Sequence, residues 1–210
     1  MALPLDFMAS VLVTLFVVVD PIGLVPTFLG ITGGLPRTAR RQVAVRAAFI
    51  AFAILTGSAL IGDWLLRTMS ISLPAFRIAG GLLLFSIAFE MVFGLRTTRQ
   101  SETAGQAIEE RVRNIAAFPL AIPLMAGPGA ITATVLLAGR ADGDVLRVAL
   151  LIAIIAAVML LCLLVFLTAG RIQYLLGATG ETVLSRLLGV LLAALAVQFV
   201  IDGVRALAAG

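Results

Sequence analysis

The sequence predicts an all-α polytopic membrane protein. We expect six transmembrane helices, arranged as two inverted three-helix repeats, with helices 1 and 4 broken at mid-membrane. Of the 210 residues, 61% are hydrophobic and 12% charged, and the mean hydropathy is +1.16. Soluble domains carry about 25% charged residues. The apolar runs are continuous rather than alternating, which excludes a β-barrel.

The apolar runs are long enough to cross a bilayer, because about 20 apolar residues do so as a helix. The expected spans are Leu5–Ile31, Val43–Leu66, Leu73–Leu95, Ile115–Ala138, Val145–Thr168 and Leu184–Leu207. The longest polar stretch, residues 96–114, is the expected cytoplasmic linker. It separates a first repeat, residues 1–95, from a second, inverted repeat, residues 115–210. The N-terminal residues lack the basic region of a cleaved signal and are interpreted as the start of span 1.

All basic residues are arginine, with no lysine or histidine. The loops after spans one, three and five hold ten arginines, against five on the opposite side. The positive-inside rule therefore predicts that these loops are cytoplasmic and that both termini lie outside the cell membrane. In this setting the arginines act as topology signals, and no nucleic-acid partner is expected.

The two halves of the chain share matching residues at a nearly constant spacing. The pairs are Pro21 and Pro128, Thr27 and Thr134, Arg77 and Arg186, Gly80 and Gly189, and Gly94 and Gly203, the last two being expected to end helices. An odd number of spans per half requires the halves to be inserted in opposite directions. Inverted repeats with matching interrupted helices are typical of transporters. The alternative is a chance resemblance between apolar sequences.

Spans one and four each contain residues that interrupt a helix near the middle of the run. The first carries Asp20-Pro21-Ile22-Gly23-Leu24-Val25-Pro26, and the second carries Gly127-Pro128-Gly129. Proline removes a backbone donor and glycine permits unusual conformations. Lipid cannot satisfy the freed backbone groups, so they must face protein or a wet cavity. The alternative is that the prolines only kink two packed helices.

The interruptions predict one binding site for a small solute. A helix that restarts presents N–H groups and partial positive charge, which favour a carboxylate. A helix that ends presents C=O groups, which favour an ammonium group. One site with both polarities suits a zwitterion such as an amino acid.

Asp20 adds a carboxylate to this site, and a charge at mid-membrane is costly unless it is neutralised or paired. It is the candidate for the coupling proton or for binding a substrate ammonium group. The alternative role is that of a helix N-cap, which does not exclude transport. Gln198, near the middle of span six, either lines the site or bonds to a neighbouring helix. The predicted substrate-binding residues are Asp20, Pro21, Gly23, Thr27, Gly127, Pro128, Gly129, Ala130 and Gln198.

Catalytic and metal chemistry find little support in the sequence. The chain has no histidine, and its single cysteine, Cys162, excludes a disulfide framework. A carboxylate pair would need Asp20 with Glu90 or Asp202, which lie at different depths. We therefore expect no enzyme, no cofactor and no metal. A drug exporter, a small-ion transporter and a channel remain as alternatives to a solute carrier, and the oligomeric state stays open.

Four stretches of the sequence resemble the MarC (UPF0056) family of six-span inner-membrane proteins. They are VVVDPIGLVPTFLGIT (17–32), RIAGGLLLF (77–85), FPLAIPLMAGPGAITATVLLAG (118–139) and GVLLAALAVQFVIDGVR (189–205). The family includes proteins described as small neutral amino acid transporters of the SnatA type, and it is grouped with LysE-type exporters. The resemblance implies proton-driven transport of glycine or alanine across the inner membrane. The expected partners are that substrate, protons and the lipid bilayer.

Overall fold

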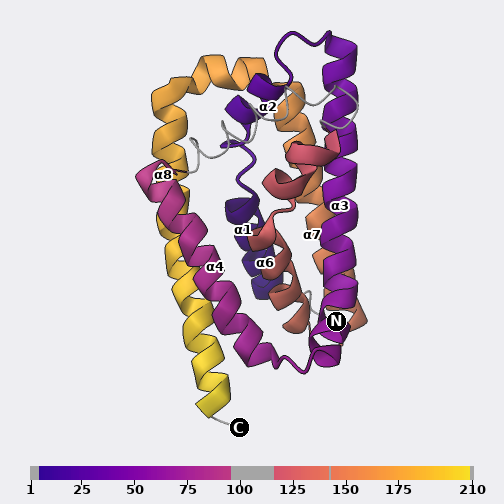
Figure 1. The fold of residues 1–210 in the computed structure, drawn as a ribbon, viewed down its shortest axis with the longest axis vertical. Helices are drawn as coiled ribbons and strands as arrows, with labels where there is room; N and C mark the ends of the chain where they lie inside the picture. Colours follow the sequence, from indigo (N-terminus) through magenta and orange to yellow (C-terminus); the bar gives the residue numbers. More distant parts are fainter. Residues whose placement is uncertain (1–4, 96–115, 142, 209–210) are drawn as a thin grey trace.

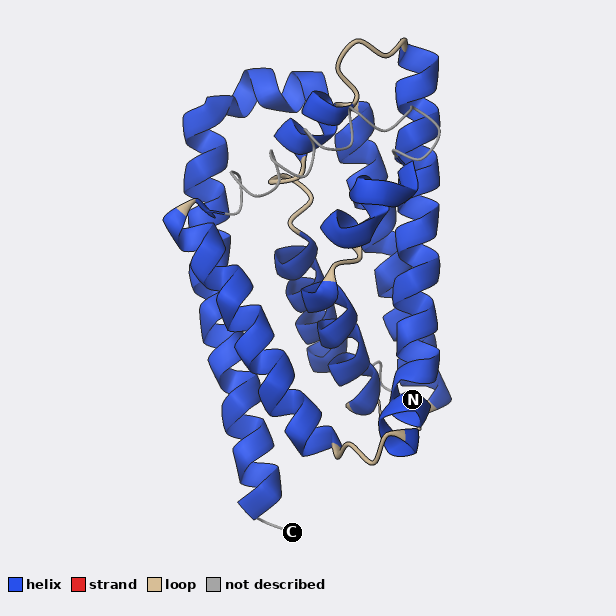
Figure 2. Cartoon of the chain, viewed as in Figure 1, coloured by secondary structure: helices blue, strands red, loops and turns tan. Residues whose placement is uncertain are grey.

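The computed structural model describes residues 5–95, 116–141 and 143–208, and in these ranges the chain is a bundle of helices joined by short turns (Figures 1 and 2). The predicted all-α class is confirmed. The helices are α1 (Leu5–Val19), α2 (Val25–Ile31), α3 (Arg37–Thr68), α4 (Leu73–Phe93), the π-helix η1 (Ala116–Met125), α6 (Pro128–Gly139), α7 (Val145–Leu167) and α8 (Ala169–Ala208). The expected cytoplasmic linker, residues 96–114, lies outside the described residues.

Four described helices are long and apolar enough to cross a membrane. They are α3, α4, α7 and the part of α8 from Thr182 to Ala208. The apolar helices α1 and α6 are shorter, with 15 and 12 residues. At 1.5 Å per residue they reach about 20 Å, less than the roughly 30 Å of a hydrocarbon core. Each is followed or preceded along the chain by a further short helix, α2 after α1 and η1 before α6.

Two helices begin earlier than the sequence predicted. Helix α3 begins at Arg37 rather than Val43, directly after Pro36, and α8 begins at Ala169 rather than Leu184. The extension of α3, residues 37–42, contains three arginines and one alanine, which favour helix although they are too polar to count as a span. The extension of α8, residues 169–183, is of mixed composition and contains three glycines. Within α8, Gly177 has φ 62° and ψ 173°, and the chain bends there. The bend precedes the apolar, membrane-crossing part of α8, Thr182–Ala208 (Figure 1).

The two glycines expected to end helices behave differently. Gly94 ends α4 in the left-handed conformation, with φ 76°. Gly203 lies inside α8, which continues to Ala208. A methyl group on Gly203 would lie 2.7 Å from Ile78 Cγ1 and 2.9 Å from the Pro74 carbonyl oxygen. The residue therefore allows α8 to pack closely on α4 instead of ending the helix.

The bundle places α4 and α8 side by side on one flank and α3 and α7 together on the other (Figure 1). Helix α1 packs against α6, α7 and α8, and α6 packs against α3 and α4. The first and last described residues lie toward the same end of the bundle, and the start of α3 and the α7–α8 junction lie at the other (Figure 1).

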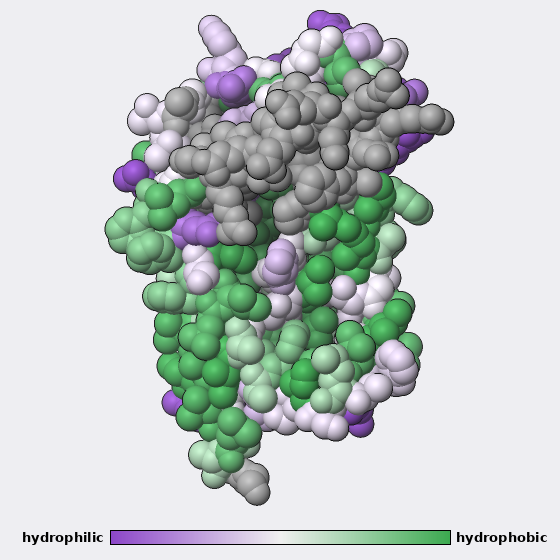
Figure 3. All heavy atoms as spheres, in the orientation of Figure 1, coloured by the Kyte–Doolittle hydropathy of each residue, from purple (hydrophilic) through white to green (hydrophobic). Residues whose placement is uncertain are grey.

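The surface is largely apolar. Figure 3 shows hydrophobic residues over much of the face formed by α4 and α8, with hydrophilic residues toward the ends. Several large apolar side chains are exposed, including Phe49, Trp64, Leu82, Leu160 and Val190. Exposed apolar area of this extent fits a protein surrounded by lipid.

Candidate functional site

The first interruption of the chain is organised by Asp20. Helix α1 ends at Val19, and Asp20 takes a left-handed conformation with φ 53°. Its backbone N–H donates to the Phe16 carbonyl oxygen over 2.9 Å, which closes α1. Its side-chain Oδ1 accepts a hydrogen bond of 3.1 Å from the Gly23 N–H. Asp20 thus follows the end of one helix and stabilises the turn that leads to α2, but it is not the helix N-cap of the alternative hypothesis, because the N-cap of α2 is Leu24 and has no side-chain cap hydrogen bond.

The Asp20 carboxylate is enclosed by its own turn. Asp20 is 2% exposed, and the neighbouring Pro21 is also buried. A methyl group on Gly23 would lie 2.7 Å from Asp20 Cγ and would collide with Oδ2. Thr27, in the first turn of α2, is buried as well. The first set of predicted residues therefore forms one compact buried unit.

The second interruption lies between η1 and α6. The η1 segment contains Pro119 and Pro123, and neither can donate to an α-helical ladder. Gly127 is extended, with φ −76° and ψ 173°, and its carbonyl oxygen accepts from the Ile131 N–H over 3.0 Å. Pro128 is the first residue of α6 and is exposed. The first N–H groups of α6 have no acceptor within their own helix, as at any helix start.

The start of α6 lies against the end of α1. A methyl group on Gly129 would be 3.7 Å from Val18 Cγ1 and 3.3 Å from Leu84 Cδ2, and it would collide with Ile87. Gly129 is therefore needed for close packing of α6 on α4 and α1. Ala130 is also buried, and its carbonyl oxygen accepts from the Thr134 hydroxyl at 2.7 Å. These contacts bring the two interruptions together, but Gly129 and Ala130 serve packing there.

Gln198 is involved in a different contact. Its side chain is exposed, and Nε2 donates to Asp202 Oδ1 of the same helix over 2.7 Å. Arg140, just after α6, donates to Asp202 Oδ2 at 3.2 Å and to Ser10 Oγ at 3.5 Å. Its guanidinium carbon also lies 5.0 Å from the centre of the Phe199 ring. This polar cluster links α1, α6 and α8, and it holds Asp202 in an ion pair with Arg140.

Sequence reasoning missed one neighbour of Asp20. The Cys162 side chain of α7 is fully buried and lies within electrostatic reach of the Asp20 carboxylate. A lone cysteine in an apolar run carries no signal of such a position. Within the described ranges, no group of three His, Cys, Asp or Glu side chains could hold a metal ion.

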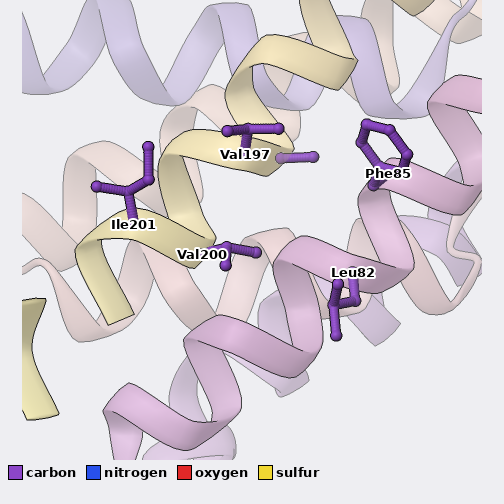
Figure 4. Close-up of a pocket in the computed structure, with 6 residues that line it drawn as sticks. Leu82, Phe85, Val197, Val200 and Ile201 are labelled. Carbon is purple, nitrogen blue, oxygen red and sulfur yellow. The ribbon is translucent and has the colours of Figure 1, made fainter. Parts of the chain in front are cut away.

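A surface cavity between α4 and α8 is apolar throughout. Its volume is about 250 Å³, and Figure 4 shows Leu82, Phe85, Val197, Val200 and Ile201 around it. With no polar group in its lining, it offers nothing to orient a polar solute. The polar candidate site remains the pair of interruptions.

Comparison with known proteins gives full-length matches. The model of the MarC family, described as MarC family integral membrane protein, matches residues 5–208. The chain is 38% identical to a UPF0056 membrane protein of Methanocaldococcus jannaschii, covering 91% of this chain and 93% of the relative. It is 36% identical to one from Aquifex aeolicus (91% and 89% covered) and 34% identical to YhcE of Escherichia coli (93% and 91% covered). No solved structure gives a significant match.

Proposed function

We propose that this chain, which belongs to the MarC family of integral membrane proteins, is a secondary transporter that binds a small solute between its two helix interruptions. The observation that carries the proposal is the buried Asp20 carboxylate at the first interruption, with the second interruption packed beside it through Val18 and Gly129. Interrupted helices that meet at one depth are how many secondary transporters build a solute site.

The packing of the helices supports an inverted repeat. In this arrangement α1–α2 corresponds to η1–α6, α3 to α7, and α4 to α8. Helix α1 packs on α7 as η1 packs on α3, and α2 packs on α8 as α6 packs on α4. Exchanging the two halves exchanges the contacts within each of these two pairs, as a pseudo-two-fold axis in the membrane plane would.

Contacts between α4 and α8 support the same symmetry at residue level. A methyl group placed on Gly94 would lie 3.9 Å from Arg186 Nη2. A methyl group placed on Gly203 would contact Ile78, the residue that follows Arg77. Gly94 of α4 thus lies near Arg186 of α8, and its sequence counterpart Gly203 of α8 lies against Ile78 of α4, which follows the counterpart arginine Arg77. Rocking of one half against the other around a central site is the usual mechanism of such folds.

The chemistry of the site favours a small zwitterion. The start of α6 offers N–H groups and partial positive charge to a carboxylate. Asp20 offers an anionic partner to an ammonium group or a place for a coupling proton. Because Asp20 is only 2% exposed, this conformation is closed around it, and solute access needs a rearrangement. We propose glycine or alanine as the substrate and protons as the coupling ion.

Transport by purified protein in liposomes tests this function. Radiolabelled glycine or alanine should accumulate when a proton gradient is imposed and should saturate with concentration. Asp20→Asn should reduce gradient-driven uptake at least about tenfold, because the carboxylate is lost while asparagine keeps the oxygen that accepts from Gly23 and tolerates the left-handed conformation. Asp63→Asn, at an exposed carboxylate paired with Arg67, is the matched control and should transport normally.

Three outcomes would contradict the proposal. Uptake that does not depend on the proton gradient and does not distinguish among amino acids would contradict the proposed amino acid substrate. Flux that rises without saturation would favour a channel. Normal proton-driven uptake by Asp20→Asn would leave Asp20 with only its role in stabilising the turn.

A further inference from the structure

We infer that the arginine-rich end of the bundle holds a binding site for the headgroup of an anionic phospholipid. The site is a cavity of about 550 Å³ where the start of α3 meets the junction of α7 and α8. Four arginines line it, and they come from two helices: Arg37, Arg40 and Arg41 from α3 and Arg171 from α8. The site is distinct from the interruptions and does not depend on which solute is carried.

The electrostatics of the start of α3 favour a bound anion. The first turn of α3 has no acidic residue, and Pro36 supplies no side-chain cap. The partial positive charge of a helix start is unfavourable for cations, so arginines there repel both the helix and one another. Among the described residues, no carboxylate forms an ion pair with any of the four arginines. A bound anion would relieve this repulsion.

The environment of the Arg40 side chain also favours a bound anion. Its Nε is buried and has no hydrogen-bond partner among the described residues, and its Nη2 reaches the Thr32 carbonyl oxygen only at 3.5 Å. A buried donor without an acceptor is costly. Phosphate oxygens are suitable acceptors, because guanidinium groups bind them with two parallel hydrogen bonds.

The surroundings favour a lipid over a free anion. Phe166 and Leu167, at the end of the membrane-crossing α7, form part of the lining. A second hollow of about 350 Å³ shares Arg41 and continues along α3 to Arg46 and the exposed Val45. The arginines could thus bind a phosphodiester while acyl chains follow the apolar surface below. The positive-inside rule places this end at the cytoplasmic leaflet, where basic pockets between helices bind anionic headgroups.

Native mass spectrometry of the detergent-solubilised chain tests the inference. Phosphatidylglycerol and phosphatidylcholine are added at equal concentration, and the occupancy of each is measured. We expect a preference of at least about tenfold for phosphatidylglycerol. The double variant Arg41→Gln with Arg171→Gln changes two exposed side chains, so it should fold, and it should lose about fivefold in affinity for each arginine.

Two controls make the result decisive. Arg205→Gln removes one exposed arginine from the opposite end of the bundle and should retain the full preference for phosphatidylglycerol. Inorganic phosphate at millimolar concentration should not displace the lipid.

Equal binding of the two lipids, or an unchanged preference in the double variant, would overturn the inference. Binding of inorganic phosphate alone with displacement of the lipid would show a soluble-anion site instead.

Discussion

At the scale of single residues, Asp20 combines a backbone role and a chemical role. The left-handed conformation costs most side chains about 1 kcal/mol, but aspartate is among the few that adopt it readily. The hydrogen bond from Gly23 to its carboxylate offsets part of that cost. Replacement by asparagine therefore isolates the charge, whereas replacement by alanine would change charge and backbone together.

Gly23→Ala should disrupt the turn that holds the Asp20 carboxylate. The added methyl group would collide with that carboxylate, so the carboxylate must move or the turn must open. We expect uptake to fall at least about tenfold and the free energy of unfolding to fall by about 1–3 kcal/mol, as for other overpacked sites. Uptake in liposomes and thermal unfolding in detergent measure the two effects.

Gly30→Ala is the matched control, because a methyl group at Gly30 of α2 meets nothing within 4 Å. It should behave like the unmodified chain in both measurements. If Gly23→Ala and Gly30→Ala transported equally well, the position of the Asp20 carboxylate would not matter for transport.

The sequence predicted those site residues whose roles depend on local contacts. Asp20 and Gly23 are three residues apart, and their hydrogen bond belongs to one turn. Helical spacing also predicts the pairing of Gln198 with Asp202, which lies four residues further along α8. This local contact was not among the expected roles of Gln198. Gly129 could not be assigned to packing, because that role depends on Ile87 of another helix.

At the scale of helices, the contact between α4 and α8 rests on glycines. A methyl group on Gly81 would lie 2.7 Å from the Ala196 carbonyl oxygen, and one on Gly189 would lie 2.8 Å from Met91 Cβ. Small residues let helix backbones approach closely, which is the main source of helix association in a bilayer. Gly81 and Gly189 thus allow α4 and α8 to approach closely.

Gly81→Ala should therefore weaken the α4–α8 pair. The obstacle is a backbone oxygen, which cannot rotate away as a side chain can. We expect a loss of about 1–3 kcal/mol in the free energy of unfolding, measured by denaturant titration in detergent. Gly57→Ala in α3, where a methyl group meets nothing within 4 Å, should be neutral or stabilising by up to about 1 kcal/mol. Equal stability of the two variants would show that α4 and α8 tolerate a wider separation.

Composition predicted the membrane-crossing parts of the helices better than their ends. Long apolar stretches identify α3, α4 and α7 because hydrophobicity is summed over many residues. The early starts of α3 and α8 were not predicted, because their polar residues are also typical of loops. At the start of α3, arginine and alanine are nevertheless good helix formers. The π-helical pattern of η1 also has no simple sequence signature beyond its two prolines.

At the scale of the whole molecule, the distribution of arginines and the direction of the chain fit the same orientation in the membrane. The first and last described residues lie toward one end of the bundle, and the start of α3 and the α7–α8 junction, which line the four-arginine cavity, lie at the other (Figure 1). The positive-inside rule therefore predicts an orientation with the arginine-rich end in the cytoplasm and both termini outside.

Cysteine labelling in whole cells tests this orientation, and the chain is suited to it because Cys162 is its only cysteine and is buried. In a Cys162→Ala background, Ala208→Cys at the end of α8 should react with a membrane-impermeant maleimide in intact cells. Gln173→Cys, exposed near the start of α8, should react only after the cells are permeabilised. The two positions belong to one helix on either side of the Gly177 bend, so opposite accessibility requires the apolar part of α8 to cross the bilayer. The reverse pattern would invert the orientation and move the proposed lipid site to the outer leaflet, and labelling of both positions from outside would contradict a crossing by α8.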